Sequence, residues 1–320
     1  MKEQPLVYII MINHNSYGDT SECINSLKQI SYNNYKSIVV DNGSIDNSFF
    51  KLRDEYDDVI FIRNSDNIGF SAGNNVGIRR ALIDNPYAIL LLNNDTIVTS
   101  NFLNNAVELL LSSNTIGIVG GKIYYYIHKD IIWAAGGKIN WHRGTISGIG
   151  NRVLDKGQFD KIREVDYCPT TMALIKSDVF EHVGLLPECY FICYEEAEFS
   201  YRSQNMGHRS MYCPTMCIYH KVGFSSRESA KNIYNHYRNR FLFQKRNLSK
   251  KKWMIWSAVF CIYAFIKKNI VGIILYIFDR KYLYKWKLIK LAFDETKVKE
   301  KILLEDLISI ENSIFSNYLG

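Results

Sequence analysis

Short apolar runs alternate with longer amphipathic segments through the first hundred residues of the chain. The apolar runs lie at residues 6–12, 38–40, 59–62 and 89–92, and each has the length of a buried strand. The segments between them have the apolar spacing of helices that cover one face of a sheet. This alternation predicts an α/β fold, in which right-handed crossovers build a parallel sheet with helices on both faces.

The first amphipathic segment has the clearest helical signal. Its apolar side chains recur at helical spacing as Cys23, Ile24 and Leu27, and Asp19 is followed three residues later by Glu22. A capping side chain followed by an acid at this distance is the arrangement of a capping box. We therefore expect a helix that begins at Asp19.

Polar residues follow each of the four predicted strands. They are NHN at 13–15, DNGS at 41–44, NSDN at 64–67 and NNDT at 93–96. Such residues are common in turns for backbone reasons, so any one of these segments alone is typical of an ordinary turn. Ligands of parallel sheets gather at the carboxyl ends of the strands, and four polar segments at that edge together predict a binding site.

The rest of the chain falls into two parts of different composition. Residues 117–223 are rich in Tyr, Gly and Cys, and they are expected to add strands and one helix to the same sheet. After about residue 232 the chain is rich in Lys, Arg, Trp and long aliphatic side chains. We expect one α/β domain over 1–232, with halves at 1–116 and 117–232, and a helical C-terminal region over 233–320.

The composition indicates in which cellular compartment the protein is found and what kind of partner it binds. Of the 320 residues, 47% are hydrophobic, which is enough for a globular core. Lys and Arg number 39 against 32 Asp and Glu, and the net charge of +7 favours an anionic partner such as a nucleotide, a phosphorylated lipid or a membrane surface. The N-terminus lacks the pattern of a signal peptide, and seven cysteines form no dense framework, so we expect a cytoplasmic location.

Two cysteine pairs raise the question of a structural zinc site. Cys189 and Cys193, and likewise Cys213 and Cys217, share a C-x-x-x-C spacing, and His208 lies between the pairs. Structural zinc sites usually use shorter spacings, and both pairs lie in aromatic, strand-like runs. Buried free thiols are therefore expected at these positions, with zinc as the alternative.

Two common nucleotide-binding motifs are missing from the sequence. No G-x-G-x-x-G follows the first strand, and no G-x-x-x-x-G-K-[ST] occurs. A diphosphate can instead be neutralised by a divalent cation, which needs a carboxylate at a strand end and a helper ligand. Asp95 in LLLNNDT meets that need, although an acid at this place also suits the cap of a turn.

Four segments in a fixed order carry a family resemblance. They are IVVDNGSID (38–46), NIGFSAGNNVGI (67–78), LLLNNDT (90–96) and CYEEAEFSYRSQNMGHRSMYCPTMCIYH (193–220). Together they resemble glycosyltransferase family 2, more narrowly its bacterial rhamnosyltransferase- and galactofuranosyltransferase-like members, over roughly residues 5–245. The resemblance implies a GT-A fold, in which a Rossmann-like nucleotide-binding half (1–116) and an acceptor-binding half (117–232) share one sheet.

The resemblance also implies an activity. It is that of an inverting glycosyltransferase, which moves a sugar from a UDP- or dTDP-sugar to a hydroxyl of a glycan acceptor in cell-surface polysaccharide biosynthesis. Asp41 matches the carboxylate that hydrogen-bonds the donor's base, and Asn74 lies in the segment that faces the donor's phosphates. With the polar strand ends, the expected donor site consists of Asn13, Asn15, Asp41, Asn42, Asn67, Gly69, Asn74 and Asn94.

A metal site is implied at the end of the fourth strand. Asn93 and Asp95 occupy the two positions of the family's D-x-D motif, and His220 matches a histidine that completes the site in related enzymes. Asn93 supplies one anionic oxygen fewer than a full D-x-D. We expect Mn²⁺ or Mg²⁺, held by these residues and the donor's diphosphate, because both ions accept a mixed oxygen and nitrogen ligand set.

Three acids crowd the start of the last motif. Glu196 matches the position of the family's general base, and such a base contributes a rate factor of roughly 10² to 10⁴. Tyr194 and Glu195 are expected on the acceptor side. Because Glu198 is also close in sequence, like charge and partial burial are expected to raise at least one pKa. The alternative for Glu195 and Glu198 is the favourable interaction of acids with a helix N-terminus.

The C-terminal region contains two apolar runs, at 253–266 and 270–278. Neither reaches the roughly twenty residues that a membrane-spanning helix needs. Three lysines at 250–252 precede the first run, which is typical of helices that rest on the anionic inner face of a membrane, where a lipid-linked glycan would be the acceptor. The alternative is a helical pair that packs on protein or forms a homo-oligomer.

Two other functions compete with a transferase. A sugar-phosphate nucleotidyltransferase also uses a parallel sheet and a metal, but it normally has a glycine-rich basic loop after the first strand, and INHNSYGD lacks one. A catalytically inactive scaffold that binds nucleotide sugars is the third hypothesis. Nucleic-acid binding is not expected, because the positive charge gathers near the C-terminal apolar runs and not on an aromatic-studded face.

Overall fold

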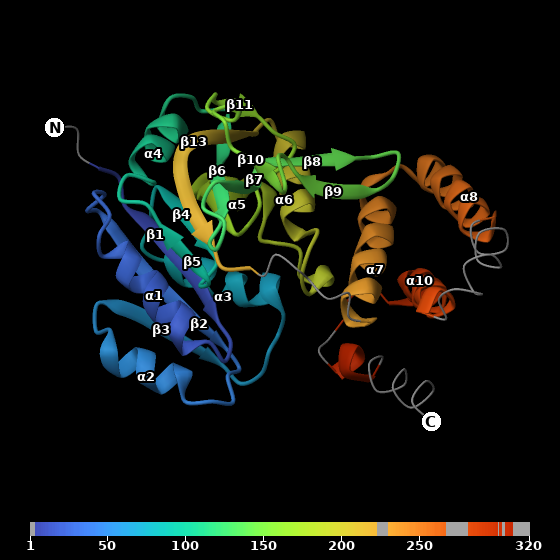
Figure 1. The fold of residues 1–320 in the computed structure, drawn as a ribbon, viewed down its shortest axis with the longest axis horizontal. Helices are drawn as coiled ribbons and strands as arrows, with labels where there is room; N and C mark the ends of the chain where they lie inside the picture. The colour runs from blue at the N-terminus through green and yellow to red at the C-terminus, as the bar shows by residue number, and fades with distance from the viewer. Residues whose placement is uncertain (1–3, 223–229, 267–280, 300, 303–304, 310–320) are drawn as a thin grey trace. The chain divides into compact units, whose positions relative to one another are not determined.

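The chain forms two compact units (Figure 1). The computed structural model describes residues 4–222, 230–266, 281–299, 301–302 and 305–309. Unit 1 comprises Met1–Ile139, Ile146–Glu188 and Glu195–Ser225. Unit 2 comprises Asn140–Thr145, Cys189–Tyr194 and Ser226–Gly320.

Unit 1 is built on an 11-stranded sheet whose first part is parallel. Its strands lie in the order β3 (Val59–Asn64), β2 (Tyr35–Asn42), β1 (Val7–Asn13) and β4 (Ala88–Leu92). The register places Asn13 beside Asp41 and Asp41 beside Arg63 at the carboxyl ends. Because the chain first builds outward from β1 to β3 and then places β4 on the other side of β1, the strand order reverses there, where ligands of such sheets bind.

Helices cover both faces of the sheet. One buried core contains side chains from α1 (Tyr17–Leu27), α2 (Ser48–Glu55) and α4 (Asn104–Leu111). The other contains side chains from α3 (Phe70–Leu82), α5 (Ser177–Val183) and α6 (Glu195–Asn205). Successive residues of β1 alternate between the two cores, as the two-residue period of a strand requires. The predicted α/β fold is confirmed.

The second part of the sheet is mixed. β12 (Met172–Lys176) pairs antiparallel with β4 and with β6 (Ile116–Tyr125), and β7 (Ile131–Ala135) and β10 (Val153–Leu154) extend the sheet beyond β6. β13 (Arg209–His220) runs parallel to β6 and antiparallel to β5 (Thr96–Val98) and β11 (Arg163–Glu164). β8 (Gly137–Asn140) and β9 (Thr145–Gly148) form a separate two-stranded sheet. This part has two α-helices, α5 and α6, where the sequence predicted one.

Two boundaries differ from those expected. α1 begins at Tyr17 and not at Asp19, and Ser16 occupies the N-cap position; its hydroxyl donates to the Asp19 carboxylate at 2.9 Å and makes no capping bond to the backbone. Serine followed three residues later by an acid has the same capping spacing. The strands also run beyond their apolar runs, so that Asn13 and Asn42 are the last residues of strands and not parts of turns.

Unit 2 has an apolar core of its own. It is formed by α7 (Ala230–Asn247), α8 (Lys250–Ile266), α10 (Lys281–Val298) and residues near the end of the chain. Phe241 is at its centre, with edge-to-face contacts to Phe260 at 4.9 Å and Phe293 at 5.0 Å between ring centroids. The predicted apolar run at 270–278 lies outside the described residues. Among the helices that are described, none is long and apolar enough to cross a membrane.

α7 also binds the short segment Cys189–Tyr194. The side-chain nitrogen of Asn239 lies 3.0, 2.7 and 3.0 Å from the carbonyl oxygens of Tyr190, Ile192 and Cys193. Asn239 itself is fully buried, so its amide depends on these carbonyls as hydrogen-bond partners.

The same segment has a strained backbone. Phe191, Cys193 and Tyr194 have φ angles of 63°, 69° and 77°, in the left-handed region that residues other than glycine rarely adopt. Such conformations persist only where surrounding contacts hold them. The Asn239 amide is one of the contacts that keep this segment in place directly before α6, together with the bond from Arg238 to the Cys189 carbonyl and the packing of Phe191 in the core of unit 2.

We predict that Asn239→Ala destabilises the protein by about 2 to 3 kcal/mol, because three backbone carbonyls lose a buried donor and the strained segment loses one of its supports. Urea unfolding measures this. Asn247→Ala, at the partly exposed end of the same helix, removes a bond to the Phe243 carbonyl within the helix and is expected to cost less than about 1 kcal/mol. Equal stability of the two variants would contradict the role given to Asn239.

Candidate functional site

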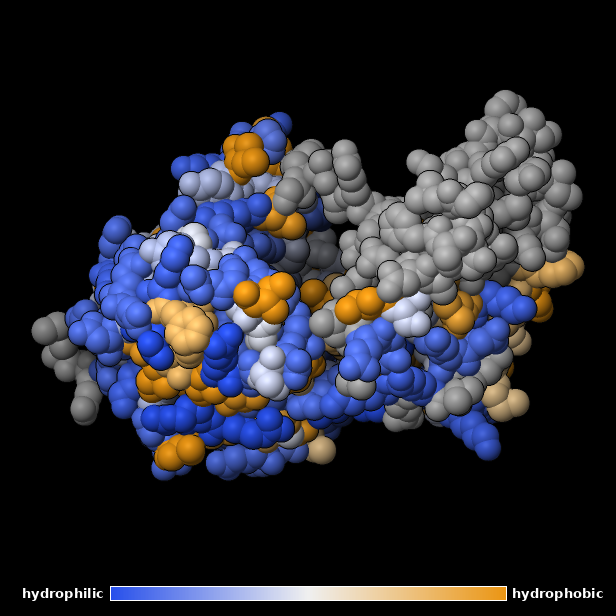
Figure 2. Space-filling model, turned by 90° about the horizontal axis from the view of Figure 1, so that it is seen from below, coloured by the Kyte–Doolittle hydropathy of each residue, from blue (hydrophilic) through white to orange (hydrophobic). Residues whose placement is uncertain are grey.

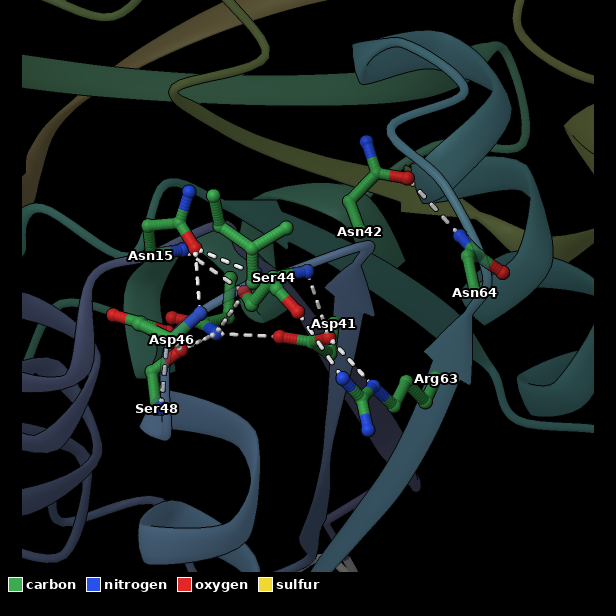
Figure 3. A network of polar contacts seen from close by, with 10 residues as sticks. Asn15, Asp41, Asn42, Ser44, Asp46, Ser48, Arg63 and Asn64 are labelled. Carbon is green, nitrogen blue, oxygen red and sulfur yellow. Dashed lines mark hydrogen bonds and ion pairs between the residues drawn. The ribbon is translucent and has the colours of Figure 1, made fainter.

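Asn13, the last residue of β1, is the centre of a buried hydrogen-bond network. Its side-chain nitrogen donates to Asp41 Oδ1 at 2.7 Å and lies 3.2 and 3.0 Å from the hydroxyls of Ser44 and Ser48. Its side-chain oxygen accepts from the Thr20 hydroxyl at 3.0 Å. We call these five residues the first network, and part of it is drawn in Figure 3.

Asn94 joins the first network from β4, which lies on the opposite side of β1 from β2. It follows β4, and its side-chain amide donates to the Thr20 hydroxyl at 2.8 Å. Thr20 in turn donates to Asn13. The polar ends of β1, β2 and β4 therefore form one connected group at the position where a parallel sheet binds its ligands.

Asp41 is fully buried, and both of its oxygens have partners (Figure 3). Oδ1 accepts from Asn13, and Oδ2 accepts from the Ser44 backbone N–H at 3.2 Å and lies 3.5 Å from Arg63 Nε. A buried carboxylate needs such compensation, because burial otherwise disfavours its charge. A ligand that contacts Asp41 has to take the place of one of these groups.

Asn15 fixes the turn that follows β2. It has a φ of 53°, and its side-chain oxygen accepts from the backbone N–H groups of Ile45 at 2.9 Å and Asp46 at 3.3 Å. Its own N–H donates to the Ser44 hydroxyl at 2.9 Å. Figure 3 shows its side chain over this turn.

Asn42 is the centre of a second network. Its nitrogen donates to Asn67 Oδ1 at 3.0 Å and to the Gly69 carbonyl at 3.2 Å. Its oxygen accepts from Asn64 Nδ2 at 3.1 Å and from the Ile68 N–H at 3.3 Å. Three of the expected donor-site residues, Asn42, Asn67 and Gly69, therefore meet here, at the ends of β2 and β3 and the start of α3.

Gly43 brings the two networks together. Its φ is +75°, and a Cβ at this position would lie only 2.4 Å from the backbone carbon of Asp66. The turns after β2 and β3 therefore touch through backbone, which only glycine allows. Asn74, by contrast, donates to the Phe70 carbonyl of its own helix at 2.9 Å and forms part of neither network.

Asp95 and His220 come together from distant parts of the chain. β5 pairs with β13 so that Thr96 lies opposite His220, and the Lys221 N–H donates to the Asp95 carbonyl at 2.9 Å. Asp95 Oδ1 lies 3.1 Å from His220 Nε2. The two atoms nevertheless do not meet the geometry of a hydrogen bond, and Oδ1 has no hydrogen-bond partner among the described residues.

This approach without a hydrogen bond fits two ligands of one cation. Neighbouring ligands of an octahedral ion with bonds of about 2.1 Å lie about 3 Å apart. Asn93 Oδ1 is also buried without a partner among the described residues, while the Asn93 N–H is bonded to the Thr171 carbonyl. No group of three His, Cys, Asp or Glu side chains that could hold a metal occurs in the described part of the chain, so a cation here needs ligands from a bound molecule or water.

Glu195 and Glu196 are in the first turn of α6. α6 is followed by a short turn and then by β13, which runs in the opposite direction. The start of α6 and the end of β13, where His220 is the last residue, therefore lie at the same end of the sheet (Figure 1). Glu195 is 3% exposed, and burial together with the neighbouring Glu196 raises its pKa well above the usual range. The expectation of a raised carboxyl pKa is confirmed. Glu198 lies 3.9 Å from Arg202, one turn later in α6.

Tyr194 belongs to unit 2. Its hydroxyl donates to the Gly144 carbonyl at 3.1 Å. Of the residues expected on the acceptor side, Glu195 is therefore in unit 1 and Tyr194 in unit 2.

Three residues of the site escaped the sequence analysis. Thr20 and Ser48 are helical residues whose hydroxyls face Asn13, and Arg63 faces Asp41 from the next strand. The parallel register of β2 and β3 would have indicated Arg63, because it lies opposite Asp41.

All seven cysteines are thiols. Cys213 is buried as expected, and Cys189 and Cys217 are partly buried, but Cys193 is exposed. The burial expected of Cys193 was wrong because this residue lies in the strained segment between two helices and not in a strand.

Comparisons with known proteins agree with this geometry. The family model described as "Glycosyl transferase family 2" matches residues 8–184. The low-salt glycan biosynthesis hexosyltransferase Agl10 of Haloferax volcanii is 28% identical over 249 residues, which are 76% of each chain.

Two solved structures are similar in fold. The mannosyltransferase PcManGT from Pyrobaculum calidifontis, in complex with GDP-Man and Mn²⁺, has a TM-score of 0.57 at 13% identity, covering 93% of this chain and 88% of that one. GalNAc-T7 with UDP, GalNAc and Mn²⁺ has a TM-score of 0.64 at 14% identity, covering 99% of this chain and 59% of that one. The expected GT-A fold is confirmed.

The raised pKa of Glu195 predicts a pH-dependent stability. Above the ordinary glutamate pKa of about 4.3 the unfolded chain releases this proton while the folded chain keeps it, so stability falls as pH rises until the folded pKa is reached. Glu195→Gln removes this loss. We expect the free energy of unfolding of the variant, relative to that of the wild type, to rise by up to about 1.4 kcal/mol per pH unit above pH 4.3. Urea unfolding across pH measures this difference. The exposed Glu108→Gln should show no such trend, and parallel profiles for Glu195→Gln and wild type would refute the prediction.

Proposed function

Because the chain belongs to Glycosyl transferase family 2, we propose that it moves a hexose from a nucleoside-diphosphate sugar to a hydroxyl of a glycan acceptor, with inversion at the anomeric carbon. The observation that carries the proposal is the approach of Asp95 Oδ1 and His220 Nε2 to 3.1 Å without a hydrogen bond. This pair lies beyond the end of β4, whose next residues also contribute Asn94 to the first network.

The two networks are proposed to form the donor side. They fix the backbone and side chains at the ends of β1, β2 and β3. Because these side chains are already ordered, they would lose little conformational entropy when a nucleotide binds. The proposed contact residues remain Asn13, Asn15, Asp41, Asn42, Asn67, Gly69, Asn74 and Asn94, and the donor base is uracil or thymine. Asn13 and Asp41 are bonded to each other, and Asn42 is bonded to Asn67, so we assign these three buried residues mainly to shaping this edge.

Asp95, His220 and Asn93 are proposed to hold Mn²⁺ or Mg²⁺ together with oxygens of the donor's diphosphate. Asp95 Oδ1 and Asn93 Oδ1 have no hydrogen-bond partner among the described residues, and His220 Nε2 lies 3.1 Å from Asp95 Oδ1, which fits this purpose. When bound, such an ion stabilises the negative charge that builds up on the leaving diphosphate. Mn²⁺ accompanies the nucleotide in both similar structures, as their descriptions state.

Glu196 is proposed as the base that takes the proton of the acceptor hydroxyl. Two adjacent carboxyl groups in a buried turn do not both ionise easily. Because burial and the neighbouring Glu196 raise the pKa of Glu195, we give the proton-accepting role to Glu196 and a positioning role to Glu195. The leaving diphosphate and the acceptor proton are thus handled by separate groups, as an inverting displacement requires.

The acceptor and the cellular setting are proposed from the wider comparison. A relative that acts in glycan biosynthesis supports a glycan acceptor. We propose a lipid-linked glycan, in cell-surface polysaccharide biosynthesis of a bacterium, at the cytoplasmic face of the membrane. Residues 1–232 would then carry the catalytic groups, and 233–320 would locate the enzyme or join it to a second copy.

Asp95→Asn tests the metal site with a nearly isosteric change. We expect the affinity for UDP in the presence of Mn²⁺ to fall at least about tenfold, because a neutral amide is a poorer ligand for a hard dication. Affinity without metal should change little. Isothermal titration calorimetry with and without Mn²⁺ measures both, with His220→Ala as a second variant and the exposed Asp57→Ala as a control. An unchanged effect of Mn²⁺ in both site variants would contradict the assignment.

Glu196→Gln tests the base. The transfer rate is expected to fall by roughly 10² to 10⁴, because the amide cannot accept the proton, while donor affinity stays within about twofold. Sugar transfer to an acceptor panel and donor binding are measured side by side. The exposed Glu181→Gln on α5 serves as the matched control. Transfer at the wild-type rate in Glu196→Gln would exclude this residue as the base.

A further inference from the structure

α8 is apolar on all sides after its first turn, but its two faces have different surroundings. Trp253, Trp256 and Phe260 point into the core of unit 2. On the opposite side, large apolar side chains recur through the helix with exposed fractions of 47% to 61%; these are Met254, Ile255, Val259, Ile262 and Ile266. We call these five residues the outer face of α8.

Such a surface is unusual for a protein in water. Single exposed apolar residues are normal, and the face of unit 1 seen in Figure 2 is mostly hydrophilic with small apolar groups. A continuous apolar helix face of several turns instead marks a site of interaction. Helices that are apolar all round are found in protein cores or in contact with lipid.

The charge around this helix indicates an anionic partner. Residues 229–278 contain no Asp or Glu, and their basic residues are Lys231, Arg238, Arg240, Lys245, Arg246, Lys250, Lys251, Lys252, Lys267 and Lys268. The lysines at 250–252 are exposed and form the first turn of α8. Cations at a helix N-terminus oppose the helix dipole, so these three lysines do not serve the stability of α8 itself.

We propose that α8 lies on the surface of an anionic lipid bilayer, with its outer face among the lipid chains and the lysines at 250–252 on the headgroups. The seventeen described residues of α8 span about 25 Å as a helix, which is shorter than the bilayer's hydrocarbon core, and two lysines, Lys267 and Lys268, follow them in the sequence; we therefore place the helix along the surface. A second copy of the chain is a poorer partner for this face, because its own lysines would add like charge to the contact.

The proposal concerns binding and does not depend on the chemistry of unit 1. If the proposed transfer is also correct, α8 holds the enzyme where lipid-linked acceptors are found. Membrane binding is measured without any donor or acceptor, so a failure of one idea leaves the other open to its own test.

The experiment is flotation of the purified full-length protein with vesicles. Wild-type protein should float with equimolar phosphatidylcholine and phosphatidylglycerol, bind pure phosphatidylcholine far less, and lose binding as salt is added. Ile255→Glu with Ile262→Glu should lower the partition coefficient at least tenfold at every salt concentration. Replacing the three lysines at 250–252 with Gln should lower binding to the anionic vesicles on the order of 100-fold and remove most of the preference for them.

The control also replaces two exposed apolar residues with Glu, but on unit 1. Ile83 and Leu111 are 72% and 53% exposed, and Ile83→Glu with Leu111→Glu should leave vesicle binding unchanged. Circular dichroism and the unfolding midpoint establish that each variant is folded. The proposal is overturned if wild type does not bind anionic vesicles, or if the control loses binding as much as the α8 variant. It is also overturned if the outer face holds together a dimer that does not bind vesicles, as sedimentation would show.

Discussion

The geometry of unit 1 depends on parallel strands that end together in buried polar side chains. Asn13 has no contact with water, yet it occupies the last position of an otherwise apolar strand. Its amide satisfies Asp41 and two hydroxyls, and these in turn hold the turn that follows β2. An unpaired polar group at this depth would cost about 1 to 3 kcal/mol, so each partner constrains the others. The result is a rigid edge made of asparagine, serine and threonine side chains and not of a glycine-rich loop.

Beside that rigid edge, a few polar atoms have no hydrogen bonds. Asp95 Oδ1 and Asn93 Oδ1 are buried without hydrogen-bond partners among the described residues. A folded protein satisfies nearly all of its buried polar groups, so these two exceptions directly after β4 need an explanation. Ligands that arrive from outside the chain supply it. Both polar atoms of the Asn13 side chain are hydrogen-bonded, whereas Asp95 Oδ1 has no hydrogen bond among the described residues. This difference separates the groups that shape the site from those that we propose to act in it.

Unit 2 follows a different physical plan. Its core is aromatic, and it fastens the strained segment Cys189–Tyr194 through the buried Asn239 amide. That segment is continuous with Glu195 and Glu196 at the start of α6. The same helical unit also exposes the apolar outer face of α8 next to a run of lysines. The two features use different helices and different forces. α7 holds the segment through hydrogen bonds, whereas α8 exposes apolar side chains and lysines.

The sequence alone was sufficient for the parallel half of the fold and for most of the candidate site. Apolar runs that end in polar residues are a local signal, and carboxyl ends of parallel strands share one edge, so Asn13, Asp41 and Asn94 were expected together before any coordinates. The start of α1 was misplaced because two candidate capping patterns, Ser16 with Asp19 and Asp19 with Glu22, share Asp19. The pairing of Asp95 with His220 was available only through a family resemblance, since nothing local links residues 125 apart in the chain. Their distance, the raised pKa of Glu195 and the role of Asn239 required the tertiary structure. The distance depends on the register of β5 against β13, and the other two depend on burial; non-local packing sets all three, and no short stretch of sequence encodes them.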